Sequence, residues 1–363
     1  MPYLATLYPS GSSNCAFLSA AVCWAVYNEV CPYSLSVLNV GVNVAEHQCC
    51  CLLAPCCTMA PLTYIARALL PLAIFSLPAP GPYAVQTKTY SIPELKTTGG
   101  TKTAEVYAPK TPGIYPYISF AHGIIDAGYD ALMRDIAAYG FVVSNMKTCA
   151  GEPVCSLATF TEDQLYMLDF AEAMRKQGDL LFSMANTTNV GLAGHSYGGM
   201  ATATNTRKND PRVRAAWHLN PCPCSAIVEG GGDKNACKAA AIGVPVVYST
   251  SSGDNVCDQV QVYDHFHCAK AKTKFFANAD KFVHQDPEYP APQGGHWNGF
   301  VGKFFRCYLS GESAACGYMD SQTQSDTLCK AYPMLVGTYG KTQCFTPSNP
   351  DPYHAGDPYV SSC

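Results

Sequence analysis

A short glycine-rich stretch in the middle of the chain holds the residues best suited to nucleophilic chemistry. Gly194-His195-Ser196-Tyr197-Gly198 fits the pattern G-x-S-x-G, in which small flanking residues allow a sharp strand-to-helix turn that lifts the serine hydroxyl clear of the backbone. Such a serine can attack a carbonyl carbon if a histidine takes its proton and a carboxylate orients that histidine. The pattern predicts Ser196 as a nucleophile; the alternative is a small residue in an ordinary glycine-rich turn.

The segments around Ser196 alternate between strand-like and helix-like patterns. Such alternation predicts an α/β fold with a mostly parallel central sheet flanked by helices, and it places Ser196 where a strand becomes a helix. The expected elements are strands at 115–121, 140–144, 189–193, 213–219, 244–249 and 274–279, and helices at 130–139, at 164–176 and from about residue 300.

The partners of the serine must come later in the chain if they follow the order nucleophile, acid, base. Asp254 lies five residues beyond the strand that ends at Ser249, and Asp258 is the alternative acid. His284 follows the end of the last strand by five residues, which is a short route to the serine, whereas His296 stands in the glycine-rich stretch GGHW. All histidines after the acid are candidate bases: His265, His267, His284, His296 and His354.

Four stretches resemble α/β-hydrolases related to cutinases and polyester hydrolases, dienelactone hydrolases, chlorophyllases and platelet-activating-factor acetylhydrolases. They are SFAHGIIDAG, DIAAYGFVVS, GHSYGGMAT and VPVVYSTSSGD, within a resemblance that covers roughly residues 84–311. The resemblance implies an α/β-hydrolase fold and a Ser-His-Asp triad that needs no metal and no organic cofactor. It puts the acid on Asp254 and the base on His284, with His296 as the alternative base. It also puts the oxyanion-hole N–H groups on Ile124 and Tyr197.

Two departures from these relatives bear on the substrate. Cutinase-like polyester hydrolases carry an aromatic residue where this chain has Ile124, and a tryptophan that would fall at Cys222. The expectation is therefore a serine esterase acting on lipid or other hydrophobic esters, with transient contact to a lipid surface. The alternatives are a cutinase-like polyester hydrolase and, in a different class, a catalytically silent binding protein with the hydrolase fold.

Composition excludes some partners. The chain has 363 residues, of which 48% are hydrophobic, and this suits one main domain with appendages. A net charge of −4 with 23 Lys and Arg leaves no basic stripe for nucleic acid. The stretch GTYGKT resembles the end of a P-loop, but its first glycine would be Leu335, so nucleotide binding is not expected.

The cysteines divide unevenly and indicate the compartment. Eight of the twenty lie in the first 57 residues and twelve lie from Cys149 onward, which favours disulfides and an oxidising environment. Cys268 is expected in a disulfide, with Cys257 as a candidate partner. Residues 59–84 resemble a secretory signal peptide, which predicts secretion, with targeting to an organelle as the alternative. Residues 1–58 form a Cys-rich leader of uncertain status, 85–310 the hydrolase domain, and 311–363 a disulfide-stapled extension.

Overall fold

A computed structural model of the chain describes the part that carries the predicted chemistry. The described residues are 81–97, 101–124, 128–148, 156–222, 242–290, 295–321, 323, 326–331, 334 and 343–350. The Cys-rich leader, nearly all of the proposed signal segment, His354 and the GTYGKT stretch lie outside them.

The described residues build one nine-stranded mixed sheet in the order β1-β2-β4-β3-β5-β6-β7-β8-β9. The six strands from β4 to β8 in this order run parallel. At the edges, β1 pairs antiparallel with β2, β2 with β4, and β9 with β8. The strands are β1 (Val85–Ser91), β2 (Thr103–Pro109), β3 (Tyr115–Ala121), β4 (Val142–Lys147), β5 (Ala185–His195), β6 (Val213–Leu219), β7 (Val246–Gly253), β8 (Lys274–Val283) and β9 (Cys344–Phe345).

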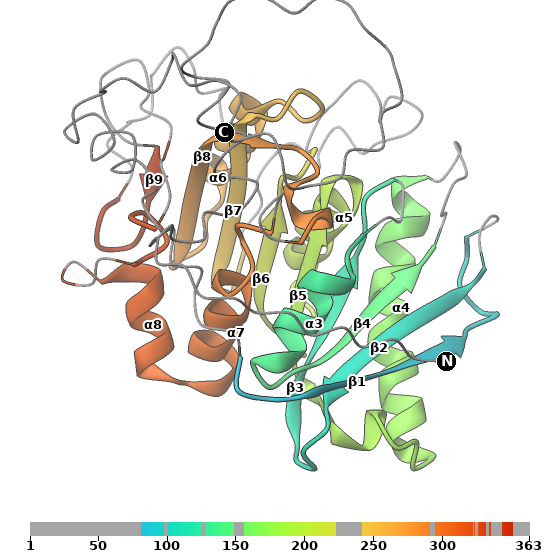
Figure 1. Ribbon diagram of the computed structural model, residues 1–363. Helices are drawn as coiled ribbons and strands as arrows, with labels where there is room; N and C mark the ends of the chain where they lie inside the picture. The colour runs from blue at the N-terminus through green and yellow to red at the C-terminus, as the bar shows by residue number, and fades with distance from the viewer. Residues whose placement is uncertain are drawn as a thin grey trace, which may run out of the picture. The chain divides into compact units, whose positions relative to one another are not determined.

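Helices cover both faces of the sheet, as Figure 1 shows. They are α3 (Asp130–Ala138), α4 (Leu157–Lys176), α5 (Ser196–Arg207), α6 (Gln259–Cys268), α7 (Phe300–Ser310) and α8 (Ser313–Asp320), with short 3₁₀ turns η1 (Phe182–Met184) and η4 (Asp286–Glu288). No helix in the described ranges is long and apolar enough to cross a membrane.

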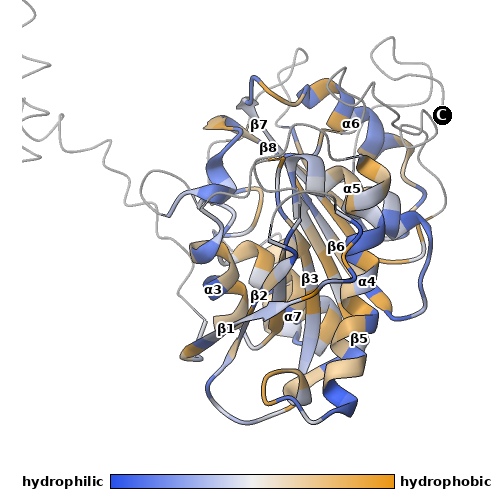
Figure 2. Ribbon diagram, turned by 90° about the vertical axis from the view of Figure 1, so that its right-hand side faces the viewer, coloured by the Kyte–Doolittle hydropathy of each residue, from blue (hydrophilic) through white to orange (hydrophobic). Residues whose placement is uncertain are grey.

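Side chains that alternate along the strands belong to two separate hydrophobic cores. In β3, Tyr117 belongs to the core that includes residues of α4, α5 and α6, whereas Ile118 and Phe120 belong to the core that includes residues of α3, α7 and α8. A parallel strand that is buried on both faces must be apolar at nearly every position, and Figure 2 shows the hydrophobic strands between the two helical layers. The expected α/β architecture is therefore present, with a mostly parallel sheet between helices.

Two predicted strands have the expected bounds, and others extend further. β3 and β6 match the predicted 115–121 and 213–219, and both are buried along most of their length, apart from half-buried Pro116 and exposed Arg214. β8 continues past the predicted end at 279 to Val283. This extension brings the strand directly up to His284.

Disulfides tie down the end of the described chain. Cys307 in α7 pairs with Cys316 in α8, and Cys329 pairs with Cys344 in β9. Together with the disulfide described below, these bonds indicate an oxidising, extracellular or secretory environment.

Candidate active site

Ser196 lies at the turn between β5 and α5. The strand ends at His195 and the helix begins at Ser196, whose φ of 56° is in the left-handed region. Two glycines allow this turn: a Cβ on Gly194 would lie 2.3 Å from the Gly198 carbonyl oxygen, and one on Gly198 would lie 2.1 Å from that of Ala121. The glycines of the motif are therefore required by close backbone approach.

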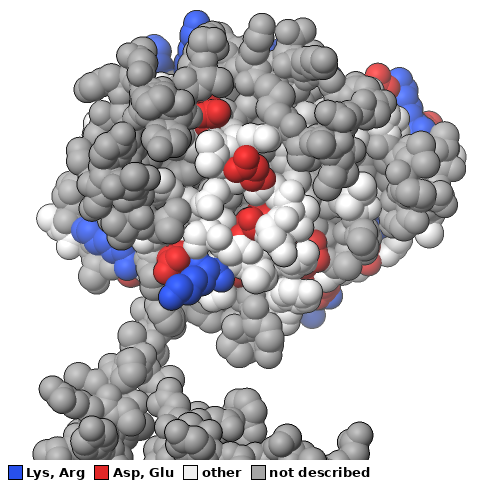
Figure 3. All heavy atoms as spheres, turned by 90° about the horizontal axis from the view of Figure 1, so that it is seen from above, with Lys and Arg blue, Asp and Glu red and all other residues white. Residues whose placement is uncertain are grey.

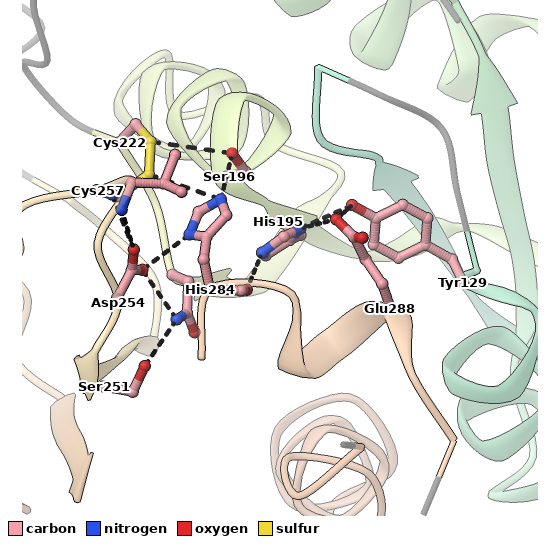
Figure 4. Close-up of a disulfide and its surroundings, with 11 residues drawn as sticks. Tyr129, His195, Ser196, Cys222, Ser251, Asp254, Cys257, His284 and Glu288 are labelled. Atoms are coloured by element: carbon pink, nitrogen blue, oxygen red, sulfur yellow. Dashed lines mark hydrogen bonds and ion pairs between the residues drawn. A yellow bond between two sulfur atoms is a disulfide. The ribbon is translucent and has the colours of Figure 1, made fainter. Parts of the chain in front are cut away.

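A continuous chain of hydrogen bonds joins the serine to a histidine and an aspartate (Figure 4). His284 Nε2 lies 2.8 Å from Ser196 Oγ, and His284 Nδ1 lies 2.8 Å from Asp254 Oδ2. Because a carboxylate only accepts, the imidazole carries its proton on Nδ1 and leaves Nε2 to accept from the serine hydroxyl. This arrangement can remove the serine proton during attack on a carbonyl.

Asp254 is held by donors on both oxygens. Its Oδ1 accepts the N–H groups of Val256 and Cys257, and its Oδ2 accepts from the Asn220 amide. Burial alone would raise the pKa of this carboxyl, but the hydrogen bond from His284 and the backbone donors outweigh burial and lower the pKa. The residue therefore stays ionised and keeps the histidine oriented.

The alternative acid and the alternative base have other partners. Asp258 caps α6 by accepting the N–H of Val260. His296 pairs through Nδ1 with Asp286 and stacks on Phe282, with ring centroids 3.8 Å apart. The structure thus brings Asp254 and His284 to the serine, and not Asp258 or His296.

Strained backbone gathers at the ends of the strands that carry these residues. Five non-glycine residues in the described ranges have positive φ, and three of them are Ser196, Asn220 after β6, and Lys281 in β8. Such conformations cost free energy and tend to occur where a site requires them. Asn220 donates to Asp254, so its strained backbone directly supports the acid.

A second network, which the sequence analysis missed, connects the motif histidine to the surrounding loops. His195 Nε2 lies 2.8 Å from the backbone oxygen of His284, and its Nδ1 lies 2.6 Å from Tyr129 Oη. The Tyr129 oxygen also accepts the N–H of Gly123 and lies 3.2 Å from a carboxylate oxygen of Glu288. Burial, followed by the nearby His284, lowers the pKa of His195 to about 3. His195 is therefore neutral, donates from Nε2 to the His284 carbonyl, and accepts from Tyr129.

The segment expected to supply the oxyanion hole lies against Ser196. A Cβ on Gly123 would lie 3.4 Å from Ser196 Cβ, so the residue directly before Ile124 lies next to the serine. Tyr197 directly follows Ser196 in the first turn of α5. Its ring packs edge-on against Phe160.

A disulfide lies beside the same three residues and corrects one expectation. Cys257 pairs with Cys222, not with Cys268, although Cys268 is itself disulfide-bonded. Cys222 Sγ lies 3.9 Å from Ser196 Oγ, and Cys257 Sγ lies 3.8 Å from His284 Nε2. The expected pairing was wrong. Cys222, directly after β6, bonds to Cys257, whereas Cys268 lies eleven positions further along the chain at the end of α6. Spacing along the chain cannot show that the segment after β6 comes close to Cys257.

Comparison with known proteins gives no further guide. No model of a known protein family matches the chain, and no curated protein is similar to it in sequence.

Proposed function

We propose that the protein is a serine hydrolase of the α/β-hydrolase fold that cleaves carboxylic esters. The observation that carries this proposal is the unbroken chain of 2.8 Å contacts from Ser196 Oγ through His284 to Asp254. The second support is the position of Ser196 at a strand-to-helix turn with left-handed backbone, at the end of a parallel strand.

The reaction proceeds through an acyl-enzyme. Ser196 Oγ attacks the ester carbonyl while its proton moves to His284 Nε2, and Asp254 stabilises the imidazolium that forms. The tetrahedral intermediate collapses, and the alcohol leaves with the proton from His284. Water then attacks the acyl-serine with the same histidine as base, which releases the acid and restores the serine.

The N–H groups of Ile124 and Tyr197 stabilise the oxyanion in both steps. Support for this role comes from the contact of Gly123 with the serine and from the place of Tyr197 in the first turn of α5. Because these are backbone roles, a side-chain change at Ile124 alters the shape of the pocket more than it alters the chemistry.

The substrate is a lipid or another hydrophobic ester, and binding involves transient contact with a lipid surface. Six large hydrophobic side chains are exposed in the described ranges, and four of them flank the acid and the base in sequence: Val256, Val260, Val283 and Tyr289. Seen from above the view of Figure 1, Lys and Arg of the described residues lie toward the margin, and acidic side chains lie among uncharged atoms in the middle (Figure 3). A neutral apolar ester suits this surface better than an anionic one.

Secretion is part of the same proposal. The three disulfides between described cysteines support folding in an oxidising compartment. The signal-like segment at 59–84 is the sequence feature that accounts for delivery there.

Covalent labelling tests the proposal most directly. A fluorophosphonate should label wild type at Ser196, and p-nitrophenyl esters of rising chain length, a phospholipid and a polyester film should rank the substrates. Ser196→Ala should abolish labelling and lower ester turnover by roughly 10³- to 10⁶-fold with the fold intact. Ser310→Ala, at the exposed end of α7, is the matched control and should behave as wild type. A folded wild type that neither labels nor turns over any ester would identify a silent binding protein instead.

A further inference from the structure

The Cys222–Cys257 disulfide touches both atoms that exchange the proton in the proposed reaction. One sulfur lies 3.9 Å from the serine oxygen, and the other lies 3.8 Å from His284 Nε2. The three side chains Cys222, Cys257 and His284 are buried, and their ligand atoms lie within 4.8 Å of one another. Among the described residues, no other group of His, Cys, Asp and Glu side chains converges in this way.

These ligand atoms come from three separate segments. Cys222 lies after β6, Cys257 lies three residues beyond Asp254 in the segment after β7, and His284 lies directly after β8. A tetrahedral zinc ion with bonds of about 2.3 Å to sulfur and 2.0 Å to nitrogen separates its ligand atoms by roughly 3.5 to 3.8 Å. The Cys257 sulfur is already 3.8 Å from Nε2, so breaking the S–S bond and moving the sulfurs apart creates the remaining spacing.

The histidine has the right tautomer for a metal. Metal-bound histidines commonly donate their other ring N–H to a carboxylate, which fixes the ring and raises its basicity. His284 Nδ1 already makes this contact with Asp254 Oδ2 at 2.8 Å. The aspartate that orients the base for serine would equally orient it for zinc.

We propose that reduction of the Cys222–Cys257 disulfide opens a zinc-binding site made of Cys222 Sγ, Cys257 Sγ and His284 Nε2. A dithiol or a phosphine supplies the two electrons that reduce the disulfide, and Cys222 and Cys257 become thiols. Zinc then binds both as thiolates and releases their two protons, and water or the Ser196 hydroxyl completes the tetrahedron. Oxidation removes the site, because the two sulfurs are then bonded to each other.

The consequence for activity rests on the proposed function. A metal on Nε2 occupies the lone pair that accepts the serine proton, so zinc should stop ester turnover only in the reduced protein. In the disulfide form the same histidine is free to act as base.

The test uses full-length protein reduced anaerobically with a water-soluble phosphine, which ends as the phosphine oxide with oxygen taken from water. Two double variants with equal numbers of cysteines are compared: Cys222→Ser/Cys257→Ser, which lacks the site, and Cys307→Ser/Cys316→Ser, which keeps it. Cadmium is titrated by its thiolate charge-transfer absorbance, and zinc inhibition is measured relative to each variant's own zinc-free rate.

We expect reduced wild type and reduced Cys307→Ser/Cys316→Ser to bind one more cadmium than reduced Cys222→Ser/Cys257→Ser. Zinc should inhibit the first two at least tenfold, reversibly with EDTA, and should leave the oxidised enzyme unaffected. His284→Ala keeps both thiols and should bind cadmium at least tenfold more weakly. Equal binding in the two double variants, unchanged affinity in His284→Ala, or a reduced protein that unfolds with and without metal would each overturn the site. Cadmium binding at the site by a protein without esterase activity would overturn only the proposed function.

Discussion

Two histidines twelve residues apart each hold a buried aspartate, yet only one of them faces Ser196. His284 pairs with Asp254 and His296 pairs with Asp286, and both carboxylates are almost fully buried. The His284 side chain is 5% exposed and its second nitrogen meets Ser196, whereas the His296 side chain is 26% exposed and its ring lies flat on Phe282. An imidazole–carboxylate pair therefore does not by itself indicate a catalytic base. What matters is whether the imidazole also contacts a side chain that could act as a nucleophile.

The two pairs also differ in what they hold together. The His296 pair fastens its own loop, since Asp286 accepts the His296 N–H and its backbone oxygen accepts the N–H of Gly295. The His284 pair joins the ends of different strands, and the His284 carbonyl accepts from His195 in the nucleophile motif. The first arrangement stabilises a loop, and the second aligns separate segments.

Among the changes that compare the two histidine pairs, His284→Ala should cause the largest loss of turnover. Removing the base should lower kcat about as much as Ser196→Ala, roughly 10³- to 10⁶-fold, because the two residues act as one unit. The measurement is turnover of the best p-nitrophenyl ester, with circular dichroism to verify folding. A folded variant that keeps a tenth of the rate would assign the base to another histidine.

Asp254→Asn should cause the second-largest loss of turnover. An amide keeps the size of the side chain but not its charge, and it disturbs the tautomer of His284, so kcat should fall by about 10²- to 10⁴-fold. The lowered pKa also predicts a pH effect: Asp254 stabilises the fold above its unfolded pKa of about 4, and this contribution is lost as pH falls through the lower folded value. The difference in unfolding free energy between wild type and the variant should therefore shrink in acid. Asp286→Asn is the matched control for turnover and should stay near the wild-type rate.

Tyr129→Phe tests the network behind the motif. It removes the hydroxyl that accepts from Gly123 and serves His195, and leaving such buried groups unpaired costs about 1 to 3 kcal/mol. We expect that loss in urea unfolding and a fall in kcat with little change in KM, because the network positions the oxyanion segment and the base loop. A fall in stability with unchanged kcat would make Tyr129 purely structural.

The smallest effect on turnover should belong to His296→Ala. It removes a stacked ring and a hydrogen bond to Asp286, so the unfolding free energy should drop by about 1 kcal/mol, while kcat stays within about twofold of wild type. Any measurable change should fall on KM. A loss comparable to His284→Ala would show that the comparison between the two histidines is mistaken.

Buried runs and short-range patterns made much of the sheet predictable. β3 and β6 are mostly apolar and buried, so their bounds follow from sequence. Three strands were missed: β1 is an edge strand with mostly exposed side chains, β2 has the polar, partly exposed Thr103 and Glu105 in its first half, and β9 has only two residues. The start of α4 was placed too late, because its first turns contain polar residues such as Thr161 and Asp163 that are buried by tertiary contacts.

The candidate site was predictable where it depends on chain order and not where it depends on space. Ser196 followed from its glycines, and Asp254 and His284 followed from the order of the motif and from the resemblance. The pairing of Cys222 with Cys257 spans 35 residues and joins two loops, so no local pattern encodes it. Tyr129 was missed for the same reason, because its partner His195 is 66 residues away.

The left-handed backbone of Ser196 has an evolutionary consequence. A side chain in this conformation costs roughly 1 to 2 kcal/mol that glycine would avoid. Random drift under selection for folding alone would therefore tend to replace this serine with glycine, and the resulting chain would be more stable. The serine in a motif that already contains two glycines is thus kept at a cost in stability.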